Sequence, residues 1–286
     1  MNFRHLPEPL RPMADAVVDF FAQERGITHF KAEEPIHKDV AIPTIHAKTQ
    51  DHQILCVEFS ETTAFPLSVE RFAPDCNRLC LPVRVFVAIP SGSSGAEYNR
   101  DLKRAREWGV GVLAVDGANV TPVQEPLSLS LAGVRRIEMP NFPSKYRFPL
   151  SQAQATFRQG NPAKGCSEVY DEIEALTRRI AKKTLKKGMW RSSKAGKAVP
   201  AINLDNGNWA NVIEVLMNQL ESGSAPHIAK PLWAQILGIT PHRNETGHKP
   251  TTREALIRRD TALRTRFEHA VDILLDLVNA SKSLHV

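Results

Sequence analysis

An arginine and a histidine five positions apart form the clearest chemical pattern in this chain. Arg243 is followed directly by the polar residue Asn244 and, after three more residues, by His248. A guanidinium binds a phosphate and offsets the negative charge that grows on it during transfer. An imidazole exchanges protons near neutral pH. Together, these groups are sufficient for metal-free cleavage of RNA.

Pairs with this spacing also arise by chance, and Arg264 with His269 is a second example. An offset of five residues on a regular helix turns by about 140°, so the side chains of that second pair diverge. Around the first pair, Thr240 followed by a proline predicts a helix start, and Gly247 and Pro250 interrupt regular structure. An interrupted helix allows the two side chains to converge. The alternative is that both are exposed residues of a solvated turn between helices.

Positive charge is concentrated in the second half of the chain. The whole chain has 37 Lys and Arg against 31 Asp and Glu, a net charge of +6. Residues 151–286 have a net charge of +7, and residues 1–150 a net charge of −1. A basic surface attracts phosphate backbones, although a solubilising helix face is an equally simple explanation.

The candidate nucleic-acid-binding residues lie where a predicted helix passes into a basic loop. Lysines in the last turns of this helix suit the negative end of the helix dipole. A tryptophan in the following loop has a flat face for stacking on a base, or covers the edge of a core. The candidates are Lys182, Lys186, Lys187, Trp190 and Arg191.

The periodicity of apolar residues predicts an α/β domain followed by a helical domain. The predicted α/β elements are a helix, a strand pair and a parallel strand–helix–strand unit, at residues 10–25, 40–47, 54–59, 83–89, 97–108 and 110–115. Prolines from about residue 120 predict a linker, with a domain boundary near residue 155. The predicted helices beyond it form a small bundle, at residues 167–187, 209–220, 229–237 and 252–280. Ser167 is the expected cap of the first, and Thr251 with Glu254 predicts a capping box for the last.

The motif of Arg243, Asn244 and His248 between helices of a compact bundle resembles the HEPN superfamily (higher eukaryote and prokaryote nucleotide-binding). The resemblance covers about residues 165–282. It implies a homodimer, formed through the helical domain, in which two motifs meet in a cleft and cut RNA without metal or other cofactor. Arg243 would bind the scissile phosphate, His248 would act as general acid and base, and Asn244 would assist positioning. The family also implies a setting in bacterial stress or phage defence.

The element order of the first half also resembles the PD-(D/E)xK core of restriction endonucleases. In that family an Asp and a Glu on a strand pair hold a divalent cation, and a Lys two positions after the Glu activates water. Asp51 and Glu58 have an acceptable spacing, but the lysine position is Ser60, with Lys48 or Lys103 as a candidate substitute. Asp is also favoured in turns. We therefore expect a degenerate domain 1–155, with a regulatory role over domain 156–286.

The remaining observations limit the class of protein. No apolar run is long enough to span a bilayer, and the N-terminal residues lack the apolar stretch of a signal peptide, so we expect a cytoplasmic protein without membrane contact. Four cysteines show no paired framework, and no Cys/His partner pair predicts zinc.

Two functional alternatives remain open beside the metal-independent endoribonuclease. One is a DNA nuclease that uses Mg²⁺ held by Asp51 and Glu58. The other is a non-catalytic protein that binds nucleic acid or a regulatory partner protein.

Overall fold

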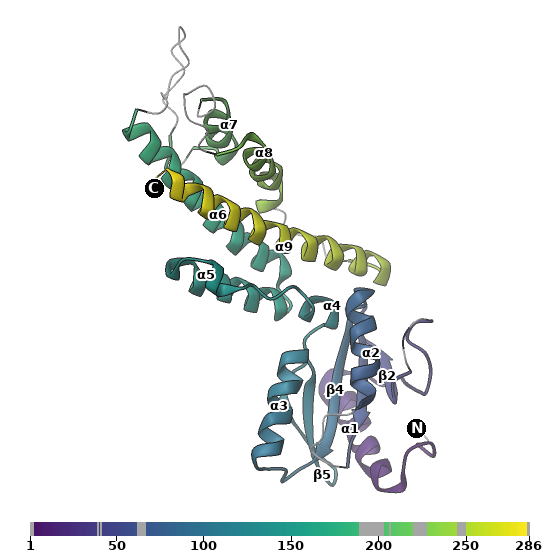
Figure 1. Ribbon diagram of the computed structural model, residues 1–286. Helices are drawn as coiled ribbons and strands as arrows, with labels where there is room; N and C mark the ends of the chain where they lie inside the picture. Colours follow the sequence, from purple (N-terminus) through teal and green to yellow (C-terminus); the bar gives the residue numbers. More distant parts are fainter. Residues whose placement is uncertain are drawn as a thin grey trace. The chain divides into compact units, whose positions relative to one another are not determined.

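The computed structural model describes residues 3–38, 40, 42–61, 67–188, 203–205, 207–219, 228–244 and 250–284. The chain divides into two compact units (Figure 1). The α/β unit comprises Met1–Val134, Arg158–Gly160 and Lys249–Ala262, and the helical unit comprises Arg135–Phe157, Asn161–His248 and Leu263–Val286. The order of an α/β half and a helical half is as predicted, but each unit is built from separate pieces of the chain.

The α/β unit contains a mixed sheet of six strands in the order β1-β2-β3-β4-β5-β6. β1, β2 and β3 pair antiparallel, β3, β4 and β5 pair parallel, and β6 returns antiparallel to β5. The bounds are β1 Phe30–Ala32, β2 Ile45–Lys48, β3 Ile54–Phe59, β4 Val83–Pro90, β5 Gly111–Asp116 and β6 Asn119–Gln124. The predicted strand pair and the parallel strand–helix–strand unit are confirmed.

Helices cover both faces of this sheet. α1 (Arg11–Arg25), preceded by η1 (Glu8–Leu10), buries Val17 and Phe21 against one face. α2 (Leu67–Arg78) and α3 (Ala96–Trp108) bury Cys76 and Ala105 against the other. The short helix α4 (Leu129–Ala132) adds Leu129 to that second core. Removing these apolar residues from water on both faces is the main force that stabilises the layers.

The proline-rich segment that we predicted as a linker is largely regular structure. It contains β6, α4, η2 (Met139–Asn141) and α5 (Ser144–Arg158), and the predicted boundary near residue 155 lies inside α5. Two of its prolines occupy places that need no backbone N–H: Pro122 is on a strand with one paired neighbour, and Pro140 is in the first turn of η2. Pro149 is inside α5, where it removes the bond to the carbonyl of residue 145.

The helical unit contains α5, α6 (Pro162–Lys186), α7 (Trp209–Gln219), α8 (Lys230–Ile239), η3 (Thr240–Asn244) and most of α9 (Arg253–Ser283). α6 and α9 run in the same direction along each other, since Cys166 Sγ donates to the carbonyl of Leu263 at 3.5 Å and Lys187 Nζ to that of Leu284 at 2.7 Å. At the start of α6, α5 packs on both helices.

Two aromatic rings and one glycine define the packing of α5. The rings of Phe157 and Phe267, from α5 and α9, lie 4.7 Å apart between centroids. A Cβ atom at Gly165 of α6 would lie 2.7 Å from the Cβ of Phe157 and 2.8 Å from the carbonyl oxygen of Ala153. A side chain at position 165 is therefore excluded by the close approach of α5.

The structure corrects two predicted helix starts. α6 begins at Pro162, with Asn161 before it, so Ser167 is inside the helix and is not its cap. For α9 the cap is Thr252, whose Oγ1 accepts a hydrogen bond from the Ala255 backbone N–H at 3.1 Å; Thr251 and Glu254 do not form the predicted box. Among the described residues, none of the helices combines the length and the apolar composition required to cross a bilayer.

Candidate functional site

The arginine of the predicted motif lies at the end of η3, which directly follows α8. Trp233, Ile236 and Ile239 of α8 are buried and fix this helix in the core of the unit. η3 in turn packs against both α6 and α8. The backbone of Arg243 and Asn244 therefore belongs to a turn that is packed on these two helices. Their side chains, and all of His248, lie outside the described residues.

The predicted role of Thr240 as the cap of a new helix is wrong. Thr240 has α-helical backbone angles, and its Oγ1 donates a hydrogen bond to the Leu237 carbonyl at 2.9 Å. Because its hydroxyl is bonded to a carbonyl of the preceding turn, it does not cap the N-terminus of a new helix. The chain tightens from α8 into a 3₁₀ turn and remains helical as far as Asn244.

The second arginine–histidine pair lies within α9, as predicted. Arg264 forms an ion pair with Glu268, at 3.4 Å from Nε to Oε1, and His269 is exposed. On this continuous helix the two side chains point about 140° apart. This pair therefore has no shared pocket.

The predicted nucleic-acid-binding lysines divide into three environments. Lys182 forms an ion pair with Asp205, and Lys187 donates to the Leu284 carbonyl. Lys186 is exposed in the last turn of α6. Trp190 and Arg191 lie outside the described residues.

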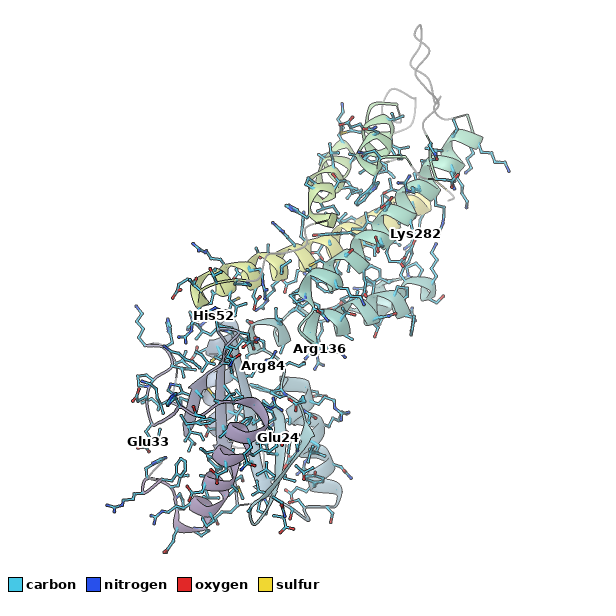
Figure 2. All side chains as sticks on the ribbon, turned by 180° about the vertical axis from the view of Figure 1, so that it is seen from behind. Glu24, Glu33, His52, Arg84, Arg136 and Lys282 are labelled. Atoms are coloured by element: carbon cyan, nitrogen blue, oxygen red, sulfur yellow. The ribbon has the colours of Figure 1, made fainter. Side chains whose placement is uncertain are left out.

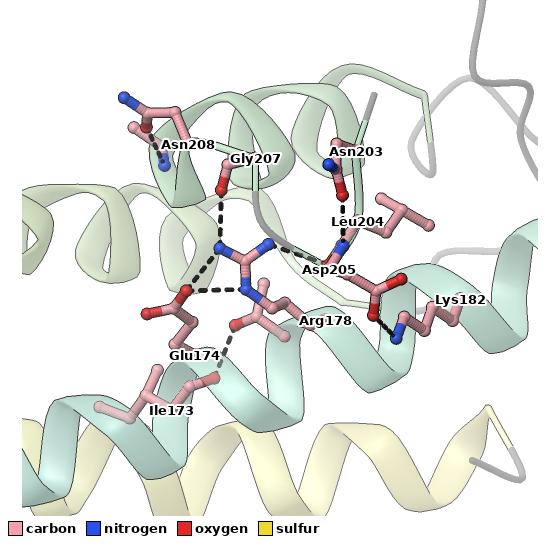
Figure 3. A network of polar contacts seen from close by, with 11 residues as sticks. Ile173, Glu174, Arg178, Lys182, Asn203, Leu204, Asp205, Gly207 and Asn208 are labelled. Atoms are coloured by element: carbon pink, nitrogen blue, oxygen red, sulfur yellow. Dashed lines mark hydrogen bonds and ion pairs between the residues drawn. The ribbon is translucent and has the colours of Figure 1, made fainter. Parts of the chain in front are cut away.

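A buried ion pair beside these lysines was not predicted from the sequence (Figure 3). Arg178 of α6 donates from Nε to Glu174 Oε1 at 2.7 Å, and the two side chains are only 15% and 9% exposed. The same guanidinium donates to the carbonyls of Leu204 at 2.9 Å and Gly207 at 2.7 Å. Arg178 therefore ties the segment before α7 to α6, which is a structural role.

The geometry of Asp51 and Glu58 does not provide one shared metal site. Asp51 lies in the turn between β2 and β3, where it accepts hydrogen bonds from Thr49 and from Gln53 Nε2. Glu58 lies near the other end of β3, and the four residue steps from Ile54 alone span roughly 13 Å. Ligands of a single ion lie much closer together than this.

Glu58 has a structural environment. It is 3% exposed, and its two carboxylate oxygens accept from the Thr44 backbone N–H at 2.8 Å and from Thr44 Oγ1 at 2.7 Å. Lys48 pairs with Ile54 at the turn end of the strand, away from Glu58. This candidate substitute is therefore misplaced for the Glu58 carboxylate.

The other titratable groups near the sheet also lack a metal-binding arrangement. His52 lies in the turn with a φ of 64°, at the same end of the sheet as Arg84 (Figure 2). His46 is buried on β2, and burial lowers its pKa. Among the described residues, His, Cys, Asp and Glu side chains nowhere gather in groups of three or more suited to a metal ion.

No protein-family model matches this sequence, and neither a curated protein nor a solved structure is significantly similar to it. Its own residues, charges and packing are therefore the basis for inferring function.

Proposed function

We propose that the protein is a metal-independent endoribonuclease of the HEPN kind, with Arg243 and His248 as its catalytic residues. The supporting observation is the place of Arg243, which lies in the 3₁₀ turn η3, packed against α6 in the helical unit. α6 ends in exposed basic residues, and such residues attract a phosphate backbone. The α/β unit, which resembles a restriction-endonuclease core without its lysine, would regulate this activity.

The proposed reaction uses the RNA's own 2′-hydroxyl as the nucleophile. His248 removes its proton as the oxygen attacks the adjacent phosphorus, and an imidazolium returns a proton to the departing 5′-oxygen. The bond from phosphorus to that 5′-oxygen breaks, which leaves a 2′,3′-cyclic phosphate and a 5′-hydroxyl. Arg243 offsets the charge on the phosphorane oxygens, and Asn244 orients the phosphate.

The test is cleavage of mixed single-stranded RNA by the full chain in EDTA. We expect Arg243→Ala and His248→Ala each to reduce the rate by at least about a hundredfold, since general acid–base groups contribute roughly 10²- to 10⁴-fold. His269→Ala is the matched control, because it removes an exposed histidine of the other pair and should leave the rate unchanged.

Three results would contradict the proposal. Activity that needs Mg²⁺ and disappears with Glu58→Ala would favour the metal-dependent DNA nuclease. Loss of activity in His269→Ala, with activity retained in His248→Ala, would show that the catalytic role was assigned to the wrong histidine. Absence of cleavage in the wild type, together with intact RNA binding, would favour the non-catalytic binding protein.

A further inference from the structure

The first turn of α5 presents a cation and an aromatic ring to solvent. Lys145 is exposed, and Phe148, one helical turn later, is 77% exposed. Phe148 is one of three large apolar side chains that stand out as exposed in the described chain, with Ile42 and Val123. Residues three apart on a helix are neighbours, so the ring and the ammonium lie on adjoining surface.

The C-terminal half of α6 contributes further cations to this surface. Arg179, Lys183 and Lys186 are exposed and are spaced by four and three residues, so they form one stripe along the helix. Arg179 and Lys183 act electrostatically on Lys145, and Arg179 also acts on Tyr146. The stripe therefore faces the start of α5.

These cations are mutually unfavourable in the unliganded protein. Burial lowers the pKa of Lys145, and Arg179 and Lys183 lower it further, while Glu172 opposes them. Within the described residues, neither Lys145, Arg179 nor Lys183 has a carboxylate within 4.0 Å. Lys145 also occupies the positive end of α5, whose first turn contains no acidic residue. A cation at that position is unfavourable with respect to the helix dipole.

A buried hydroxyl lies beneath the same cations. Tyr146 is 3% exposed, the Lys145 ammonium lies 4.8 Å from its ring centroid, and its hydroxyl has no hydrogen-bond partner of normal geometry in the described chain. Arg179 is nevertheless close enough to the hydroxyl to lower its pKa, against the larger effect of burial, which raises it. A guanidinium can only donate to this oxygen, so the hydroxyl proton of Tyr146 is left to donate to an acceptor.

We infer that Lys145, Arg179 and Lys183 bind a backbone phosphate of single-stranded RNA, with the Tyr146 hydroxyl as a further donor and Phe148 stacking on an adjacent base. The inference rests on the proposed function and names its substrate-binding surface. Among the groups that act electrostatically on Lys145, Arg179 and Lys183 are cations and Glu172 is the one carboxylate, so positive charge exceeds negative charge around Lys145. A protruding ring selects single strands, because bases within a duplex are already stacked.

The test measures binding of a labelled 20-nucleotide oligouridine to the full chain, by fluorescence anisotropy in EDTA. A His248→Ala background prevents cleavage during the measurement. We expect Phe148→Ala to weaken binding roughly 5- to 150-fold, the usual effect of losing one stacked base. Arg179→Glu and Lys145→Glu should each weaken it by about tenfold and flatten the dependence of affinity on salt.

Lys164→Glu is the matched control. It makes the same change of charge on the same helix, but at an exposed position near the other end, beside Glu168. We expect it to change the affinity by less than about twofold, since the local contacts are absent there. Duplex RNA of equal length should bind more weakly than the single strand and should not respond to Phe148→Ala.

Equal weakening by Lys164→Glu and Arg179→Glu would show a general charge effect and would overturn the inference. Unchanged RNA binding in both Phe148→Ala and Arg179→Glu would also overturn it. A third contrary result is that this surface binds anionic vesicles and does not bind RNA. The proposed function fails separately, if RNA binds through this surface but the wild-type chain never cleaves it. The inference alone fails if cleavage depends on Arg243 and His248 while the surface variants bind normally.

Discussion

At the scale of single residues, burial controls the chemistry of the cysteines. All four are buried and none forms a disulfide. Burial raises the pKa of Cys76 and of Cys166 to about 12, and raises that of Cys56 as well. The thiolate is the nucleophile and the metal ligand, so these thiols are poor candidates for either role in the folded chain.

This environment predicts slow reaction of the native protein with a thiol reagent. At pH 8 a thiol with a pKa near 12 is ionised to only about one part in ten thousand. We expect Cys56, Cys76 and Cys166 to resist Ellman's reagent in buffer and to react within minutes in 8 M urea. Mass spectrometry of the alkylated peptides assigns the sites. Rapid native labelling of Cys76 or Cys166 would show that these cores open readily.

At the scale of elements, Arg178 joins α6 to the segment that enters α7. Its guanidinium donates hydrogen bonds to Glu174 and to two backbone carbonyls, which are 4, 26 and 29 residues away in the sequence. Arg179, the next residue, lies about 100° further around the helix and is exposed. Two adjacent arginines of one helix therefore have separate tasks, one in stability and one, as we infer, in RNA binding.

These two arginines give a reciprocal test. We expect Arg178→Met to lower the free energy of unfolding by about 3 kcal/mol, because it leaves the buried Glu174 without its partner. Arg179→Met should change the stability by less than about 0.5 kcal/mol but weaken RNA binding. Urea unfolding measures the first effect and anisotropy the second. Equal stability of both variants would mean that the Arg178 contacts contribute little.

The sequence predicted those elements whose apolar spacing is long and regular. β3, β4, β5 and α3 appear within one or two residues of the prediction because each carries a clear period of two or 3.6. β1 was missed because three residues are too short for a period. The start of α6 was missed because Ser167 has the side chain of a helix cap, whereas the helix begins five residues earlier at Pro162.

For the candidate site too, features within one segment could be predicted from the sequence, and features that join distant segments could not. A motif within one segment, such as Arg243 with His248, is visible in the sequence because its spacing is local. The Tyr146 surface was not predicted, because it depends on α5 meeting α6 some 33 residues later at Arg179. The distance between Asp51 and Glu58 was misjudged for a related reason: an acceptable sequence spacing becomes a long separation once the intervening residues form an extended strand.

At the scale of the whole molecule, the proposed activity requires two copies of the chain. One motif supplies one arginine and one histidine, whereas an in-line displacement needs a base on the attacking oxygen and an acid on the leaving oxygen. A twofold axis through the helical units would bring two motifs to one phosphate. The dimer is thus a chemical requirement of the proposal as well as an implication of the family resemblance.

Mixing wild-type protein with the Arg243→Ala variant tests this requirement. The variants should exchange subunits and form particles of twice the 31.8 kDa chain mass in light scattering. If each cleft needs both motifs, equal amounts leave about one quarter of the dimers active after random pairing. RNA cleavage per total protein should then fall to about a quarter of the wild-type value. A fall to only one half would mean that each chain acts alone, and the general acid and base would have to come from a single motif.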